Sequence, residues 1–295
     1  MTHQALSACS SKFAQGEITC ALFDNQSIRC WGKNLEGQLG LGHTDDQGDE
    51  ANEMGEYLNA VNLDGNVASL AASQLSVCVL LSTFEVKCWG YALNGQLGYE
   101  DTINRGDSAN QMGEYLPFLN LGSGLQVKDL SPGANHICLT TFQDQSKCWG
   151  RNNAGQLGYG DALDRGDGPS EMGNYLPFLN VGSGLEVSSF ALGESSTCAI
   201  LSTPSSIKCW GYNMQGQLGQ GDVNARGDGG NEMGNYLPPI NLPTGFEVSS
   251  IHSGFNHFSA ISTTGNLITW GNNDYGQLGK GNADIIGNDF SEMGD

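Results

Sequence analysis

Eight of the nine cysteines fall into four pairs with members ten or eleven residues apart, and paired thiols either oxidise to a disulfide or bind a metal. The pairs are Cys20/Cys30, Cys78/Cys88, Cys138/Cys148 and Cys198/Cys209. Each pair flanks a stretch with a turn at its centre, so in a β-hairpin the two cysteines lie opposite each other, within disulfide reach. A zinc site would need a second pair nearby. The spacing therefore predicts four disulfides, and in a fifth, cysteine-free copy we align Phe258 and Thr269 with the missing pair.

Disulfides at this spacing bear on both stability and location. Closing an 11-residue loop contributes about 2.8 kcal/mol in the chain-entropy model. Four such bonds indicate an oxidising compartment, so we expect an extracellular or cell-surface protein. Cys9 is left over, at the position that Val127 and Val187 occupy in later copies. It is either a buried thiol that acts as a small hydrophobic residue or one half of a bond to another chain.

The histidines form no catalytic constellation with nucleophiles or acids. His136 and His257 occupy the same place before the hairpin, where a structural role is expected, and the other three are isolated: His3, His43 and His252. The glycine-rich stretches lack the lysine and the strand-to-helix context of a phosphate-binding loop. We therefore expect no enzyme and no cofactor.

A group of carboxylates offers one metal alternative. Oxygen ligands for calcium could come from two equivalent sets, Asp161, Asp167 and Glu171, and Asp222, Asp228 and Glu232. Their spacing is not that of a known calcium loop, and Gln111 and Asn282 interrupt the pattern elsewhere. A metal-free chain is the preferred interpretation, with calcium as the alternative.

Arg-Gly-Asp, a tripeptide known from adhesion proteins, occurs three times, with its charged residues at Arg105 and Asp107, Arg165 and Asp167, and Arg226 and Asp228. All three copies lie in a loop of constant length, so a scaffolding role explains them better than receptor recognition. We expect the arginines to contact acidic or carbonyl groups of their own or the adjacent unit, and the aspartates to form Asx-type turns. Asn25 begins the one glycosylation sequon, at a hairpin turn.

All these residues belong to a repeat that fills the chain. Its markers are Trp31, Trp89, Trp149, Trp210 and Trp270, which recur every 58 to 61 residues as anchors of the blade core. The expected repeats, numbered one to five, are approximately 1–56, 57–114, 115–174, 175–235 and 236–295. A period near 60 without helical patterning predicts stacked or radially arranged β modules that form one continuous domain.

The third repeat shows the expected strands. They are Tyr115–Leu121, Leu125–Leu130, His136–Phe142 and Gln145–Trp149, which is the content of a four-stranded propeller blade. From each Trp to the following Met is 23 residues in all five repeats, so the intervening loop is held in one geometry.

Cys-Trp-Gly followed by Gly-Gln-Leu-Gly, Gly-Asp and an Arg resembles the repeat of the regulator of chromosome condensation family, over essentially the whole chain. The resemblance implies a β-propeller with four-stranded blades, of which the founding members have seven. The paired cysteines resemble divergent copies in exported proteins of bacteria and protists. The family includes a nuclear exchange factor for a small GTPase, secreted inhibitors and plant photoreceptors, and no exchange-factor residue aligns with this chain.

Charge restricts the partners. Lys and Arg number 12 against 32 Asp and Glu, a net charge of −20, which argues against nucleic-acid phosphates and anionic membranes. No run of 18 apolar residues would span a bilayer, and Met1 to Lys12 lack the apolar core of a signal peptide. If exported, the chain is expected to be processed, a fragment, or a segment of something longer.

The number of repeats leaves three architectures open: a closed five-bladed ring, a part of a longer propeller, or an open end that accepts a strand from another copy. The first function hypothesis is accordingly a self-assembling extracellular scaffold, such as a filament or coat subunit. The alternative is a monomeric module that binds a protein or glycan through the constant loops (residues 43–53 and equivalents). Regulation of a small GTPase is the least favoured.

Overall fold

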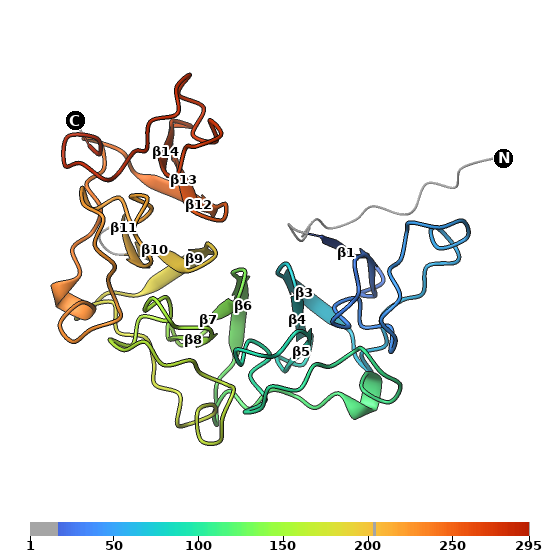
Figure 1. The fold of residues 1–295 in the computed structure, drawn as a ribbon. Helices are drawn as coiled ribbons and strands as arrows, with labels where there is room; N and C mark the ends of the chain where they lie inside the picture. Colours follow the sequence, from blue (N-terminus) through green and yellow to red (C-terminus); the bar gives the residue numbers. More distant parts are fainter. Residues whose placement is uncertain (1–16, 203–204, 295) are drawn as a thin grey trace. The chain divides into compact units, whose positions relative to one another are not determined.

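The computed structural model describes residues 17–202 and 205–294, and this part is all-β apart from two single-turn 3-10 helices. Cys9 lies outside the described residues. The chain divides into two compact units, Met1–Leu130 with Gly166–Tyr175, and Ser131–Arg165 with Leu176–Asp295. We describe each unit by itself; Figure 1 labels the elements along the sequence.

The first unit holds the strands of repeats one and two. They are β1 (Ile18–Leu22), β2 (Ile28–Gly32), β3 (Val67–Ala72), β4 (Ser76–Leu81) and β5 (Val86–Gly90), followed by the 3-10 turn η1 (Gly113–Tyr115). β1 pairs antiparallel with β2, and β3, β4 and β5 form a meander in that order. The strand β6 (Val127–Pro132) crosses the boundary between the units and belongs to the sheet β6-β7-β8.

The second unit holds the hairpin of repeat three and the sheets of repeats four and five. Its elements are β7 (His136–Thr141), β8 (Ser146–Gly150), β9 (Val187–Leu192), β10 (Ser196–Ser202), β11 (Ser205–Gly211), η2 (Gly234–Tyr236), β12 (Val248–Ser253), β13 (His257–Ser262) and β14 (Leu267–Gly271). β9, β10 and β11 form one antiparallel meander and β12, β13 and β14 another, as Figure 1 shows.

The larger sheets have three strands where the sequence predicts four. The prediction of a strand over Tyr115–Leu121 is therefore wrong. Tyr115 ends the turn η1, and the residues after it form no strand, although Leu119 N donates to Val86 O at 2.8 Å. Proline explains part of this, because Pro117 has no N–H to donate to a ladder. A side chain takes its carbonyl instead, since the Tyr99 hydroxyl donates to Pro117 O at 3.0 Å.

Four hairpins are closed by the disulfides that the cysteine spacing predicts. The bonded residues face each other across β1/β2, β4/β5, β7/β8 and β10/β11, and in each pair the Cα atoms lie 4.1 Å apart. The bonds are Cys20–Cys30, Cys78–Cys88, Cys138–Cys148 and Cys198–Cys209.

The surroundings of Cys30 differ from the predicted blade. The disulfide to Cys20 is present, but among the described residues the sheet that contains Cys30 has two strands, β1 and β2, where the sequence predicts four. The other three disulfides lie in three-stranded sheets. The backbone of Cys88 binds the Tyr99 hydroxyl, and Cys30 has no equivalent bond because its repeat carries Leu41 at that position.

The register also corrects the alignment of repeat five by one residue. Ser259, not Phe258, pairs with Thr269. Phe258 faces Trp270 instead, and the two rings stack with centroids 5.9 Å apart. Ser259 and Thr269 are therefore the residues that stand in place of a cysteine pair.

The hydrophobic cores lie between successive repeats rather than within one. In the first unit, Trp89 of repeat two is fully buried in a cluster with Leu39 and Val61 of repeat one. In the second unit, Trp210 packs with Leu157, and Trp270 packs with Leu218 in the same way. A single repeat therefore buries little of its own apolar surface, as expected of a repeat architecture.

Three of the junctions between repeats are also held by two hydrogen bonds to main-chain atoms. The Trp89 indole N–H donates to Gln38 O at 3.1 Å, and Gly42 N donates to Gly106 O at 2.9 Å. The two junctions of the second unit repeat these bonds: Trp210 to Gln156 O and Gly160 N to Gly227 O, and Trp270 to Gln217 O and Gly221 N to Gly287 O.

Glycine is required where the backbones meet. Gly155 has φ +77°, and a Cβ there would collide with the backbone of Gly227 and Asp228 in the next repeat. The reciprocal surface is equally close, because a Cβ on Gly227 would lie 2.7 Å from Gly155 O. The Gly-Gln-Leu-Gly sequence is therefore the receiving half of each junction, and the Arg-Gly-Asp loop is the entering half.

We predict that Ser259→Cys with Thr269→Cys creates a fifth disulfide, because these residues hold the register that the cysteines hold elsewhere. The gain in unfolding free energy should stay below about 2.8 kcal/mol, since Thr269 also loses its hydrogen bond to Leu278 O. Intact mass without reductant should be two hydrogens lower than after reduction of that bond alone. Ser259→Cys by itself is the control, and two more titratable thiols in the double variant than in the wild type would contradict the register.

We also predict that Gly155→Ala destabilises the second unit far more than Gly184→Ala. Both glycines have a left-handed φ, +77° and +72°, so both variants bear the same backbone cost of about 1–2 kcal/mol. Only Gly155 faces another repeat, since nothing lies within 4 Å of a Cβ at Gly184. Urea unfolding of the two variants measures the difference, and equal losses of stability would show that the close backbone approach is unimportant.

Candidate functional site

The constant loop of each repeat is closed around one side-chain oxygen. Glu171 Oε2 accepts hydrogen bonds from the backbone N–H groups of Gly166 at 2.9 Å, Asp167 at 3.1 Å and Gly168 at 2.8 Å. The same acceptor role belongs to Glu53, Gln111, Glu232 and Glu292 in the other repeats. These bonds hold the pKa of Glu53 below its ordinary value. Because the uncharged Gln111 serves equally well, the loop needs a hydrogen-bond acceptor here and not a negative charge.

The three loop arginines bind acidic and carbonyl groups of their own loop, as the sequence predicts. Arg105 donates to both carboxylate oxygens of Asp101, at 3.0 and 2.8 Å, and to Ile103 O. Arg226 likewise donates to both carboxylate oxygens of Asp222. Arg165 Nη2 lies 2.7 Å from Asp161 Oδ2. This pairing holds the pKa of Asp101 and of Asp222 below the ordinary range.

These pairs change the interpretation of Arg-Gly-Asp. The Asx-type turns are made by Asp101, Asp161 and Asp222, each of which accepts the N–H two residues on, and not by the aspartates of the tripeptide. The guanidinium groups are turned inward and only 16–20% exposed. The tripeptide is therefore part of the loop's internal framework.

A tyrosine links this loop to the disulfide strand. The Tyr99 hydroxyl accepts from Cys88 N and its oxygen lies 3.1 Å from Cys88 O, and the Arg105 guanidinium carbon lies 4.1 Å from its ring centroid. Tyr159 repeats the arrangement at Cys148. Burial raises the pKa of both hydroxyls well above the ordinary value, so they act as fixed hydrogen-bonding groups and not as acids.

Sequence reasoning missed a set of buried lysines. Lys87 is 2% exposed, and its ammonium donates to Leu63 O and Gly113 O at 3.0 and 2.7 Å. Lys208 makes the equivalent bonds to Val181 O and Gly234 O, and burial lowers the pKa of both lysines. The signal was present, because a lysine precedes Cys-Trp-Gly in three repeats. These lysines fasten the loop and the segment after it to the third strand.

His136 has a structural position. It is fully buried, its Nε2 lies 2.8 Å from Thr197 Oγ1, and Thr197 in turn donates to Gln156 O of the repeat junction. Burial lowers the pKa of His136 to about 3, so the ring is neutral near pH 7. His257, at the same register position, has its pKa lowered by burial as well.

The other singled-out residues lie as follows. In residues 17–202 and 205–294 no cluster of three His, Cys, Asp or Glu side chains has the geometry to hold a metal ion. Asp161, from the calcium alternative, is bound to Arg165 and Asn152, and Glu171 to the loop backbone. Asn25 is exposed in the β1–β2 turn, where its side chain accepts from Ser27, so its glycosylation remains a prediction.

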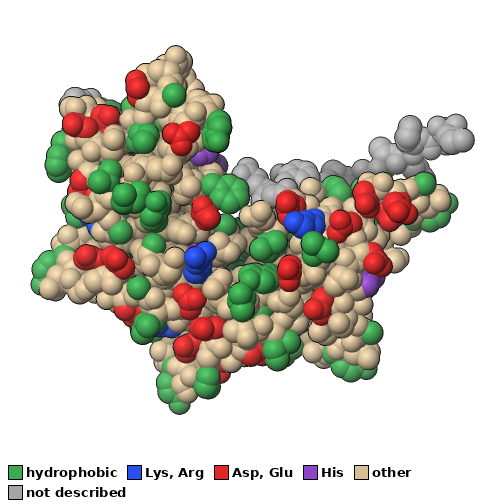
Figure 2. All heavy atoms as spheres, in the orientation of Figure 1, with side chains coloured by type: hydrophobic (Ala, Val, Ile, Leu, Met, Phe, Trp, Pro, Cys, Tyr) green, Lys and Arg blue, Asp and Glu red, His purple; other side chains and the backbone are tan. Residues whose placement is uncertain are grey.

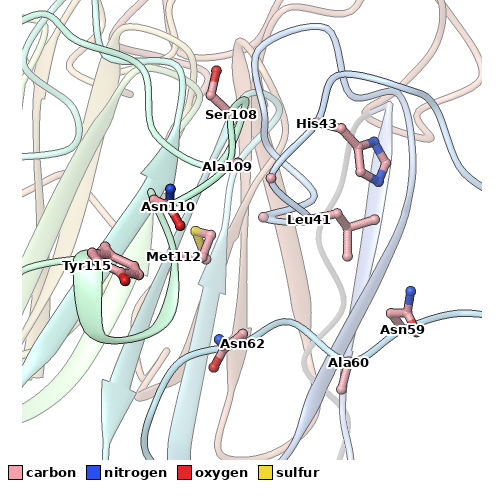
Figure 3. A pocket seen from close by; sticks show the side chains of 12 residues that line it. Leu41, His43, Asn59, Ala60, Asn62, Ser108, Ala109, Asn110, Met112 and Tyr115 are labelled. Atoms are coloured by element: carbon pink, nitrogen blue, oxygen red, sulfur yellow. The ribbon is translucent and has the colours of Figure 1, made fainter.

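One pocket, of about 380 Å³, opens in the first unit between repeats one and two. Figure 3 shows Leu41 and His43 on one side and Asn110, Met112 and Tyr115 on the other. At two of the lining positions repeat one carries smaller side chains than repeats two and three. Leu41 stands where repeats two and three have Tyr99 and Tyr159, and Ala60 where they have Phe118 and Phe178.

The chemistry of this pocket is neutral and polar. Three amide side chains line it, from Asn59, Asn62 and Asn110, together with Ser108 and the exposed ring of Tyr115. Amides and hydroxyls both donate and accept hydrogen bonds. The pocket can therefore hold an uncharged, hydrogen-bonding ligand, and no residue pair in its lining has the arrangement of a nucleophile and its base.

Acidic side chains outnumber basic ones on the surface. Figure 2 shows Asp and Glu scattered over the drawn face with few Lys or Arg among them, in keeping with the net charge of −20. The excess of acidic over basic side chains at the surface is larger than the composition implies, because the lysines and arginines described above are turned inward. Across the described ranges, no helix has the length and apolar character needed to cross a membrane.

We predict that His136 makes the second unit acid-sensitive. The unfolded chain takes up a proton near the ordinary pKa of 6.5, and the folded chain only near pH 3, so stability is lost as the pH falls through that window. The contribution approaches about 1.4 kcal/mol per pH unit. His136→Ser, which copies Ser76 and Ser196 of repeats two and four, should flatten the curve of unfolding free energy against pH between pH 6 and 4. Parallel curves for variant and wild type would contradict it.

The comparisons with known proteins agree with the repeat architecture. Residues 248–277, which hold β12, β13 and β14, match the model of the Regulator of chromosome condensation (RCC1) repeat. The Ultraviolet-B receptor UVR8 of Arabidopsis thaliana is 28% identical over 90% of this chain, and the mitochondrial RCC1 domain-containing protein RUG3 of the same plant is 26% identical over 93%. The chain spans 53% and 57% of these two relatives, a little more than half their length.

Solved structures share the fold at lower identity. Yeast RCC1 (Prp20), solved with Kap60 bound, matches with a TM-score of 0.67 at 19% identity, over 94% of this chain and 58% of that one. Human WBSCR16 matches with a TM-score of 0.64 at 21% identity, over 91% of this chain and 63% of that one. Together with the five-fold recurrence of Trp, Gly-Gln-Leu-Gly and the constant loop, these matches show that the chain is similar to proteins of the RCC1 repeat family, in a divergent form with paired cysteines, and that it shares their β-propeller type of fold.

Proposed function

We propose that this protein is a non-enzymatic, disulfide-stapled scaffold of an extracellular or cell-surface compartment, and that it works by assembling with copies of itself. The observation that carries the proposal is the uniformity of the junctions between repeats. Three junctions use the same Trp indole to Gln carbonyl bond and the same Gly to Gly backbone bond. An interface made of parts that recur in most of the repeats can also join two chains.

The side chains with unusual environments support a structural role. The buried lysines, the arginine–aspartate pairs and the buried tyrosines all bind groups of their own chain. Groups that are fully engaged in holding the fold are not available for proton transfer or nucleophilic attack. The shifted pKa values of these groups in the described part of the chain therefore follow from their structural roles and need no active site to explain them.

The disulfides support the compartment. All four lie in hairpin registers where the paired residues are fully buried, so exposure to a reductant requires the hairpin to open. Bonds of this kind persist in oxidising environments and are rare in the cytosol. The relative RUG3 is mitochondrial, and its location is not carried over to this chain.

The pocket of repeat one favours a second candidate, a monomeric module that binds a neutral ligand such as a glycan. Its amide-rich lining and the exposed Tyr115 ring suit the hydroxyl groups and the apolar faces of a sugar. Ala60→Phe restores the side chain of repeats two and three and should fill the pocket. Loss of glycan-array binding in that variant, with assembly unchanged, would favour this candidate.

Two measurements on the oxidised protein test the scaffold proposal. Alkylation in denaturant without reductant should modify one thiol, or none if Cys9 bonds to another chain, and nine only after reduction. Light scattering and negative-stain imaging should show regular assemblies larger than the 31.2 kDa chain. Nine reactive thiols before reduction would refute the compartment, and a uniform 31.2 kDa species would refute self-assembly.

A further inference from the structure

The backbone around Cys88 in repeat two forms a site for one hydroxyl group. The Tyr99 hydroxyl accepts from Cys88 N at 3.0 Å, lies 3.1 Å from Cys88 O, and donates to Pro117 O at 3.0 Å. The tyrosine of repeat three makes the same two contacts with its cysteine. In repeat four Gln220 occupies this position of the repeat and donates to Pro238 O at 3.1 Å. The three middle repeats therefore fill this site with a side chain of their own.

Repeat one keeps the backbone frame of the hydroxyl site. Val61 N donates to Ile28 O at 2.8 Å, and in repeat two Leu119 N donates to Val86 O at the same distance. These bonds hold the segment after the constant loop against the strand that carries the cysteine. Asn59 lies two residues before Val61, where repeat two has its proline, so the carbonyl of Asn59 takes the place of the proline carbonyl.

The hydroxyl itself is missing from repeat one, because Leu41 stands where repeat two has Tyr99. Cys30 and Cys20 face each other with Cα atoms 4.1 Å apart, the close pairing in which the N–H and C=O of each residue point away from the partner strand. Cys30 is fully buried, and no loop or side chain within the described residues binds its N–H or its C=O. A buried N–H in this state is costly, so the position favours an added hydroxyl group.

The pocket of repeat one supplies the space for the rest of such a ligand. It measures about 380 Å³, and its lining residues all belong to the first unit. Figure 3 shows Leu41 and Ala60 on the side of repeat one and Met112 and Tyr115 on the side of repeat two. Repeat two carries a tyrosine and a phenylalanine at the positions of Leu41 and Ala60. A flat aromatic ring therefore suits the space, and the exposed ring of Tyr115 and the thioether of Met112 can pack against it.

The polar groups of the site select a neutral hydroxyl. One donor, Cys30 N, and two acceptors, Cys30 O and Asn59 O, surround it, and a phenol hydroxyl accepts one hydrogen bond while it donates another. A carboxylate or phenolate has no hydrogen for the two carbonyl oxygens, and the net charge of −20 also opposes an anion. An ammonium group cannot accept from Cys30 N.

We propose that the pocket of repeat one binds a neutral phenol, whose hydroxyl accepts from Cys30 N and donates to Asn59 O. The ring of the ligand takes the place of the tyrosine ring in repeats two and three. Leu41 forms part of the pocket wall and is partly exposed, so its side chain turns aside to admit the hydroxyl. The proposal goes beyond the scaffold function and does not rest on it. It gives the pocket a different occupant from the sugar of the second candidate.

The test is calorimetric titration of the oxidised full chain with p-cresol, and with toluene as the probe that lacks only the hydroxyl. p-Cresol should bind one saturable site, and toluene should bind it about five-fold or more weakly. Leu41→Ala clears the path to Cys30 and should tighten p-cresol binding. Leu41→Tyr supplies the ring and the hydroxyl within the chain and should abolish it. Leu35→Tyr adds the same side chain at an exposed turn tip, so it should bind p-cresol like wild type.

Thermal unfolding gives a readout that needs no ligand. Leu41→Tyr should unfold at a higher temperature than Leu41→Phe, because both fill the pocket and only tyrosine brings a hydroxyl to Cys30 and Asn59. Equal midpoints for the two variants would overturn the proposal, since the hydroxyl site would then have no effect on the fold.

Further probes separate the sources of the phenol and the other occupants. N-acetyl-tyrosinamide that binds as tightly as p-cresol would support a tyrosine carried by a peptide, and binding of p-cresol alone would support a free phenol. Equal affinities for toluene and p-cresol would overturn the proposal in favour of a simple apolar cavity. Binding of a methyl glucoside that Leu41→Tyr abolishes, without p-cresol binding, would overturn it in favour of the sugar. p-Cresol binding that survives Leu41→Tyr would overturn it in favour of another surface.

Discussion

The hydrogen bond from the indoles of Trp89, Trp210 and Trp270 to the Gln carbonyl of the preceding repeat is the interaction on which the rest of the structure depends. It lies within the hydrophobic cluster that joins two repeats, where an unpaired indole N–H or carbonyl would cost about 1–3 kcal/mol. The bond can form only because glycine lets the backbone approach the ring, as at Gly158, where a Cβ would lie 2.7 Å from the Trp210 nitrogen. The constant loop of the following repeat is fixed as well, because its glycine packs against the same Gly-Gln-Leu-Gly turn.

The charged residues serve this framework from inside. An acidic chain with only 12 Lys and Arg places three lysines at positions 2–4% exposed and three arginines in contact with aspartates of their own loops. A buried ammonium is costly unless its donors are satisfied, and at Lys87 and Lys208 two carbonyls accept from each.

The sequence was sufficient for features set by spacing and insufficient for those set by tertiary bonds. The cysteine intervals predicted the hairpins and their disulfides, because register in a hairpin follows from the number of residues between its ends. The segment after Tyr115 has the composition of a strand, yet Pro117 and the side chains that bind its carbonyls prevent a ladder. Phe258 was misaligned because a hydrophobic residue sits beside the register position that Ser259 holds. Lys87 was overlooked because its carbonyl partners are distant in sequence.

The bonds at a junction between repeats do not constrain the tips of the turns that precede the Gly-Gln-Leu-Gly sequences. Leu35, Leu93 and Met214 each follow the residue that anchors the Gly-Gln-Leu-Gly turn, and all three are more than half exposed, at 63%, 57% and 61%. Their side chains take no part in the bonds that hold one repeat to the next. Substitutions at these tips can therefore change the exposed side chains of the surface at regular intervals along the chain, while the stability of the fold stays the same.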